Sequence, residues 1–291
     1  MCDERTAGEA IDYLRRSGLT RRQFGALSVG TGLAMFWPRT ADAKIVTGAN
    51  VTVETPDGRA GCYFVHPASG AHPGVVIWPD ALGLRQVFEQ MGRRLAESGY
   101  SVLVVNQYYR NRPAPILPEG ASFQDQETRD VLGPLMGSLS AATHVTDANA
   151  FVQFLDGQSS VDTTRKIGTT GYCMGGPITM RTAAAVPDRI GAAASFHGGG
   201  LVTAAADSPH LLVPKMQASY LFAIAENDDV SDSEAKNVLR EAFASAGRFA
   251  EIEVYAGTMH GWCPPDSAVY HEAQAERAWS RMLALFETAL A

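Results

Sequence analysis

Residues 167–185 read IGTTGYCMGGPITMRTAAA, and the other motifs of the chain are best understood from this stretch. A short β-branched run meets a Gly-x-Cys-x-Gly turn, and an alanine- and methionine-rich run that predicts a helix follows. This is the strand–turn–helix setting that holds a nucleophile in a sharp turn, with Cys173 at the usual serine position. Gly171 and Gly175 fit this setting because strand and helix approach too closely there for a Cβ atom. We expect the sulfur at the strand's carboxyl end, where the helix N-terminus favours a thiolate or an oxyanion. The alternative is a buried cysteine in a tight glycine-rich turn.

The composition limits the classes of function. The chain has 291 residues, 46% of them hydrophobic, so it can bury a large core. This length admits two domains, although single α/β domains of this size are common. The net charge of −7, with no basic cluster in the body of the chain, argues against nucleic acid and anionic membrane surfaces as partners.

The N-terminal segment has the features of an export signal. Residues 20–24 read TRRQF and open an apolar, Gly/Ala-rich run to Trp37, and residues 41–43 form a small-x-small cleavage site. We therefore predict a twin-arginine signal in 1–43, recognised by the twin-arginine export machinery and cleaved after Ala43, and a single domain in 44–291. The apolar run is too short for an ordinary transmembrane helix, so we expect no stable membrane anchor and a periplasmic or secreted protein. A membrane anchor or a plain apolar arm is the alternative.

The cysteines do not form an obvious disulfide framework. Cys2 falls in the predicted signal, which leaves Cys62, Cys173 and Cys263 in the body of the chain. An odd number of cysteines suits a reactive thiol better than a set of disulfides. Proteins exported by the twin-arginine route cross the membrane already folded, so the fold need not depend on oxidation. We expect all three to be free thiols.

The remaining sequence alternates between predicted strands and helices. A hairpin is expected at 51–55 and 61–65, and buried strands at 74–78, 100–105, 167–172, 191–196, 219–225 and 251–255. Helices are expected at 85–98, 138–155, 232–246 and 268–290 and directly after the cysteine turn. This alternation predicts an α/β fold, a doubly wound, mostly parallel sheet with helices on both faces, whose site lies at the strands' carboxyl ends. The Pro/Gly-rich region 111–137 is expected to be a long excursion over that site.

Two further residues complete a possible catalytic set. Asp228 ends a later strand, and His260 follows the last strand. The order nucleophile, acid, histidine, with each residue at a strand's carboxyl end, is that of the catalytic triad in α/β-hydrolases. Asp229 is an alternative acid. His197, which ends another strand but precedes the acid, is the rival base.

These residues together resemble the dienelactone hydrolase (carboxymethylenebutenolidase) family of α/β-hydrolases. The similarity runs from about residue 51 to the C-terminus and is most specific at residues 171–176, Asp228 and His260. It implies the α/β-hydrolase fold and a cysteine–histidine–aspartate triad that opens a lactone through a thiol ester, with no metal and no cofactor.

The resemblance also implies roles around the triad. Asp80 falls where an acidic residue contacts the resting thiol, although the archetypal members have glutamate there. Arg110 matches one of two arginines that hold the substrate carboxylate, and Pro264 stands where the second would be. The alternative is that Arg110 only caps the strand end or pairs with an acidic loop residue such as Asp125 or Glu127. Trp262 is a further candidate for substrate binding.

The expected mechanism assigns one task to each residue. Cys173 attacks a small-molecule lactone or ester, Asp228 orients His260, and His260 moves the proton. The N–H groups of Met174 and Ala81 form the oxyanion hole. Because thiolate is expelled more easily than an amine, lactones and activated esters are favoured over amides.

Two other functions remain open from the sequence. One is a thioesterase or peptidase on the same fold. The other is a non-catalytic small-molecule-binding protein in which Cys173 is a structural or redox thiol.

Overall fold

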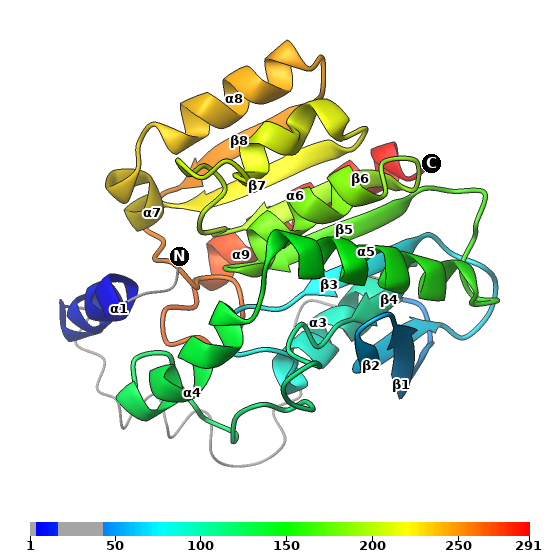
Figure 1. Cartoon of the computed structure of the whole chain (residues 1–291), viewed down its shortest axis with the longest axis horizontal. Helices are drawn as coiled ribbons and strands as arrows, with labels where there is room; N and C mark the ends of the chain where they lie inside the picture. The colour runs from blue at the N-terminus through cyan, green and yellow to red at the C-terminus, as the bar shows by residue number, and fades with distance from the viewer. Residues whose placement is uncertain (1–3, 17–42) are drawn as a thin grey trace.

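An eight-stranded sheet lies at the centre of the molecule (Figure 1), and its strand order is β1-β2-β4-β3-β5-β6-β7-β8. The structure is a computed structural model that describes residues 4–16 and 43–291. The strands are β1 Val46–Thr55, β2 Gly58–Pro67, β3 Gly74–Trp78, β4 Ser101–Val104, β5 Ile167–Tyr172, β6 Ile190–Phe196, β7 Ser219–Ala225 and β8 Ala250–Tyr255. The β1–β2 and β2–β4 pairs are antiparallel and all other pairs are parallel. The predicted doubly wound, mostly parallel sheet is confirmed.

Helices cover both faces of this sheet. They are α1 Glu4–Arg16, α3 Gln86–Glu97, α4 Gln126–Gly137, α5 Ala141–Asp156, α6 Gly175–Ala185, α7 Glu226–Ser231, α8 Ala235–Ser245 and α9 Glu272–Ala289, with a 3-10 turn at Pro209–Lys215. One hydrophobic cluster joins α3 and α9 to the sheet, and a second joins α5, α6 and α8 to the opposite face. The central strands β3, β4 and β5 are buried along their whole length because they lie between these two layers.

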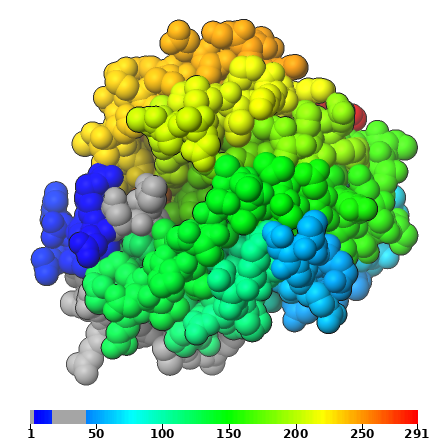
Figure 2. Space-filling view, in the orientation of Figure 1, coloured from blue at the N-terminus to red at the C-terminus, as the bar shows by residue number. Residues whose placement is uncertain are grey.

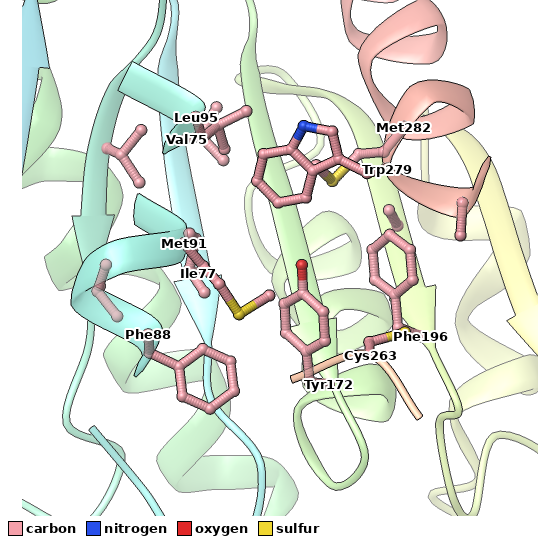
Figure 3. Packing of buried hydrophobic residues seen from close by; sticks show 14 of the residues in the cluster. Val75, Ile77, Phe88, Met91, Leu95, Tyr172, Phe196, Cys263, Trp279 and Met282 are labelled. Carbon is pink, nitrogen blue, oxygen red and sulfur yellow. The ribbon is translucent and has the colours of Figure 1, made fainter. Parts of the chain in front are cut away.

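The cluster under α3 and α9 supports the end of β5 (Figure 3). The Tyr172 ring stacks on Phe196 with centroids 4.9 Å apart, and Phe88 lies at 5.4 Å on its other side. Met91 and Trp279 close this layer from α3 and α9. The residue just before Cys173 is therefore held by aromatic packing, which fixes the position of the turn.

Three helices were not predicted from the sequence. Helix α7 occupies the turn expected after β7, and α4 forms within the 111–137 excursion. Helix α1 belongs to the segment that we assigned to an export signal; Arg21, Arg22 and the apolar run to Trp37 lie outside the described residues. In the part of the chain that the structure describes, no helix has both the length and the apolar character needed to cross a membrane.

Candidate active site

The turn between β5 and α6 has the geometry of a nucleophile elbow. Cys173 has φ 55°, in the left-handed region that residues with a Cβ atom rarely adopt. A Cβ atom on Gly171 would lie 2.1 Å from the Gly175 carbonyl oxygen, and one on Gly175 would lie 2.3 Å from the Trp78 carbonyl oxygen. Both contacts are far too short, which confirms the steric reason for these two glycines. The turn also passes close to the end of β3.

The expectation of three free thiols is wrong for Cys173. This residue is disulfide-bonded, whereas Cys62 and Cys263 are free and buried. Burial raises the pKa of the Cys62 thiol to about 12 and that of Cys263 well above its usual value. Both residues belong to the core clusters. Cys173 instead lies in the turn directly after β5, at the carboxyl edge of the sheet.

His260 and Asp228 form a hydrogen-bonded pair at that same edge. The Nδ1 atom of His260 lies 2.9 Å and 3.0 Å from the two carboxylate oxygens of Asp228. An ionised carboxylate only accepts, so Nδ1 carries the proton and Nε2 is left to act as a base. Asp228 lies in α7, and its neighbour Asp229 binds Lys236 instead.

Asn227 fixes the backbone of the histidine loop. Its Oδ1 atom accepts a hydrogen bond of 2.7 Å from the His260 N–H. Sequence reasoning missed this residue, although it directly precedes the predicted acid. The available signal was that Asn227 is a polar residue next to the candidate acid. The sequence alone does not indicate which backbone N–H its side chain would bind.

His197 lies between the elbow and the acid–base pair. The Cys173 N–H donates to the carbonyl of Phe196, the residue before His197, at 3.0 Å. The His197 ring is buried and meets the His260 ring edge-on at 5.1 Å. Neither of its nitrogens has a hydrogen-bond partner among residues 4–16 and 43–291. Burial, and then the nearby His260, lower the pKa of His197 well below its usual value. His197 therefore contacts the pair as a neutral ring, and it does not bind Asp228 as His260 does.

The two proposed oxyanion donors lie side by side. The Tyr108 hydroxyl donates to the Ala81 carbonyl at 3.0 Å and lies 3.0 Å from the Met174 sulfur. Among the described residues, the N–H groups of Ala81 and Met174 donate to no acceptor. Ile116 and α4 pack against this region, because Ile116, Leu132 and Leu135 cluster with Ala81 and Tyr108. The excursion thus covers the side of the turn that carries the two proposed oxyanion donors, and sequence reasoning missed Tyr108.

Asp80 is engaged by Arg85 in the structure. Its two oxygens accept from the Arg85 guanidinium at 2.7 Å and 2.9 Å, and one also accepts from the Leu82 N–H at 2.9 Å. Arg85 also binds Asp266, in the loop after His260, at 2.6 Å and 3.0 Å. Burial opposes the charge of Arg85, but the two carboxylates outweigh it and raise its pKa. This network ties the loop after β3 to the loop after His260, and contact of Asp80 with the thiol stays a prediction.

Arg110 and Trp262 also have partners within the chain. Arg110 donates to Asp147 at 2.6 Å and 2.9 Å, and to Asp57 at 2.6 Å and 2.9 Å. Trp262 is fully buried and stacks on Tyr255 with centroids 4.9 Å apart. Substrate binding by these two residues stays a prediction. Within residues 4–16 and 43–291, no three His, Cys, Asp or Glu side chains are grouped to hold a metal ion.

Comparison with known proteins identifies the family to which the chain belongs. A relative from Methylorubrum extorquens named "Putative carboxymethylenebutenolidase" is 26% identical over 275 residues, covering 91% of each chain. The "Carboxymethylenebutenolidase" of Pseudomonas putida is 23% identical over 234 residues, 80% of this chain and 93% of that one. The solved structure of a "Putative Dienelactone Hydrolase" from Klebsiella pneumoniae superposes with a TM-score of 0.74 at 24% identity, covering 84% of this chain and all of that one. The model of the dienelactone hydrolase family matches residues 61–290, so the chain belongs to that family of α/β-hydrolases and is a hydrolase of this type.

Proposed function

We propose that this protein hydrolyses lactones or activated esters through a Cys173–His260–Asp228 triad and a thiol-ester intermediate. The observation that carries the proposal is the Asp228–His260 pair, with Nδ1 held 2.9 Å and 3.0 Å from the carboxylate oxygens. This pair lies at the same sheet edge as a cysteine with φ 55°. Family membership supports a small-molecule ester or lactone as the substrate.

The reaction proceeds in two proton-balanced stages. His260 Nε2 takes the thiol proton, the Cys173 sulfur bonds to the carbonyl carbon, and the new oxyanion accepts hydrogen bonds from the Met174 and Ala81 N–H groups. The carbon–oxygen bond then breaks, and His260 returns its proton to the leaving oxygen. In the second stage, His260 takes a proton from water as the water oxygen attacks the thiol-ester carbon. The carbon–sulfur bond then breaks, the acid leaves, and His260 returns the proton to the Cys173 sulfur. Asp228 holds the imidazole orientation and stabilises its cation throughout.

The thiol is the active form in this mechanism. A cysteine in a disulfide has neither a proton to give nor a sulfur lone pair that can attack as a thiolate. The Cys173 disulfide must therefore be reduced before turnover, and assays require a thiol reductant.

A substrate panel with two variants tests the proposed function. Reduced protein should hydrolyse lactones and aryl esters faster than thioesters, and peptide amides least of all. Cys173→Ala and His260→Ala should each lower kcat by about a thousandfold or more, because members of a catalytic unit fail together. The matched control is Cys62→Ala, which removes a buried free thiol in β2 and should retain activity.

Activity of His260→Ala within about tenfold of the unaltered protein would remove His260 from the proposal. A preference for thioesters or peptides would replace the substrate class with the alternative on the same fold.

A further inference from the structure

Arg85 binds two carboxylates that come from distant parts of the chain. Its Nη1 and Nη2 atoms donate to the two oxygens of Asp80 at 2.7 Å and 2.9 Å. Its Nε and Nη2 atoms donate to the two oxygens of Asp266 at 2.6 Å and 3.0 Å. The guanidinium group also lies 4.9 Å from the centre of the Phe88 ring. One side chain therefore forms two bidentate ion pairs and is held in place by an aromatic ring.

The first of these carboxylates belongs to the loop after β3, which carries a proposed oxyanion donor. Asp80 directly precedes Ala81, and its carboxylate also accepts from the Leu82 N–H at 2.9 Å. The Asp80 carbonyl accepts from the Gly83 N–H at 3.0 Å. Ala81 therefore lies in a tight turn whose first side chain is bound by Arg85, so a change at Arg85 would alter the direction of the Ala81 N–H.

The second carboxylate belongs to the loop after β8, which carries the proposed base. Asp266 follows His260 in this loop. The His271 N–H donates to the Trp262 carbonyl at 3.0 Å, so the segment between these two residues forms a closed loop that contains Asp266. Its ion pairs with Arg85 join this closed loop to the turn after β3.

We propose that Arg85 is a positioning residue for the hydrolase reaction, and that it fixes the Ala81 N–H relative to His260 by binding Asp80 and Asp266 together. The effect on the rate rests on the proposed function, because it requires Ala81 as an oxyanion donor and His260 as the base. The mechanical connection between the two loops does not rest on it. A misplacement of about 1 Å between reacting groups can lower a rate by about a hundredfold, so such a connection has a large effect on kcat.

The double contact requires a guanidinium group. Its N–H donors lie in one plane and can face two carboxylates at once, whereas the ammonium group of lysine is a point charge on a flexible stem. Arg85→Lys therefore keeps the positive charge but cannot form both bidentate pairs. Asp266 is the better partner to change, because its side chain is 38% exposed and that of Asp80 only 14%. A change at Asp266 also leaves the predicted contact of Asp80 with the thiol intact.

Steady-state kinetics of the reduced protein on a neutral aryl ester test the positioning role. Asp266→Ala and Arg85→Lys should each lower kcat by about ten- to a hundredfold and change KM by less than about threefold, because Arg85 acts through the loops and not on the substrate. The double variant Arg85→Lys/Asp266→Ala should be about as active as the slower single variant, since both changes break the same connection. Asp266→Glu keeps a carboxylate and should recover most of the activity.

A second bidentate pair provides the matched control. Arg189 donates to the two oxygens of Asp156 at 2.7 Å and 3.0 Å, and both side chains are partly buried. This pair lies at the amino edge of the sheet, because Asp156 ends α5 and Arg189 directly precedes β6. In Figures 1 and 2 the carboxyl edge, with α1 and α7, is at the left of the molecule, and α5 ends at the right. Asp156→Ala should change kcat by less than about twofold.

Amide hydrogen exchange tests the connection between the loops without any activity. Asp266→Ala and Arg85→Lys should each speed deuterium uptake several-fold in peptides that cover residues 79–88 and residues 260–271, because each loop loses its anchor on the other. Asp156→Ala should leave uptake in both segments unchanged. A change at position 266 that alters uptake at 79–88 reports the contact through Arg85, since the two segments are far apart in the sequence.

The two measurements separate the proposal from the proposed function. Unchanged uptake at 79–88 in Asp266→Ala would overturn the connection. Values of kcat within about threefold of the unaltered protein in both variants, or a rise in KM alone, would overturn the positioning role. A loss of kcat in Asp156→Ala as large as that in Asp266→Ala would overturn it as well, because general destabilisation would then explain both. A reduced, unaltered protein that hydrolyses no ester would refute the proposed function and the effect on rate, while the exchange result would still decide the connection.

Discussion

Two neighbouring aspartates in α7 have different partners. Asp228 holds Nδ1 of His260, while Asp229 forms an ion pair with Lys236. Asp228→Asn should lower kcat by about a thousandfold or more, because an amide no longer enforces the productive tautomer of the histidine. Asp229→Asn is the matched control, one residue away with the same change in charge, and should alter kcat by less than about threefold. Steady-state kinetics on a neutral aryl ester measure both variants, and a larger loss in Asp229→Asn would transfer the acid to that position.

Arg110 forms ion pairs within the chain, but its partners are not the loop residues Asp125 and Glu127 that the sequence suggested. It pairs with Asp147, whose side chain is fully buried, and with Asp57 at the surface. Burial raises the pKa of Asp147, although the Arg110 hydrogen bonds and charge oppose that effect. An unpaired carboxylate at this depth is costly, so Arg110→Ala should lower the free energy of unfolding by about 3–5 kcal/mol.

Urea unfolding measures this loss. Arg59→Ala, which breaks the exposed pair with Glu54, is the control and should cost less than about 1 kcal/mol. The double variant Arg110→Ala/Asp147→Asn should recover part of the loss. A stability change below about 1 kcal/mol for Arg110→Ala would contradict the structural role. A loss of kcat/KM confined to carboxylate-bearing lactones would then support the substrate contact predicted from the sequence.

At the scale of elements, sequence prediction succeeded where packing requires a distinctive pattern. The bounds of β3, β5 and β7 agree with the predicted runs because these strands are largely buried and rich in apolar and β-branched residues. The nucleophile turn could be predicted from the sequence because only glycine fits at positions 171 and 175, where a Cβ atom would clash with backbone carbonyl oxygens.

Other elements carry no such pattern. Helix α7 has six residues, ENDDVS, and buries none of them, while α4 contains Pro134. Both depend on tertiary contacts that a local pattern does not encode. The same limit explains why Arg85 and Asn227 were missed, since their partners lie far away in the sequence, at Asp266 and His260.

Helix α5 contains a buried histidine that makes stability depend on pH. Burial, and then the charges of Arg181 and Arg110, lower the pKa of His144 to about 3. At pH values between about 3 and 6.5, His144 is protonated in the unfolded chain but neutral in the folded chain. The free energy of unfolding therefore decreases as the pH falls below about 6.5. The decrease between pH 7 and 5 attributable to His144 is about 2 kcal/mol.

The variant His144→Gln tests this by urea unfolding at the two pH values. Its stability should fall less between pH 7 and 5 than that of the unaltered protein, whereas His72→Gln, a control at a more exposed position, should leave the dependence unchanged. The same pH dependence in His144→Gln and in the unaltered protein would show that another group carries it.

At the scale of the whole molecule, we propose that residues 1–43 direct the protein out of the cytoplasm. The twin-arginine machinery reads a pair of arginines, which lysines do not replace in such recognition. Replacing Arg21 and Arg22 with lysines should therefore retain the protein in the cytoplasm, as fractionation and immunoblotting would show. Cys2→Ser, which leaves the arginine pair intact, is the control and should be exported normally. Normal export of the lysine variant would rule out this route.

The central claim is that Cys173 carries the acyl group during turnover. The most direct measurement is the intact mass of reduced, desalted protein within seconds of mixing with an activated aryl ester. We predict one acyl group per chain, located on the tryptic peptide Ile167–Arg181 and absent from Cys173→Ala. Ester turnover without any adduct on that peptide, or an adduct on Cys62 or Cys263 instead, would contradict the account.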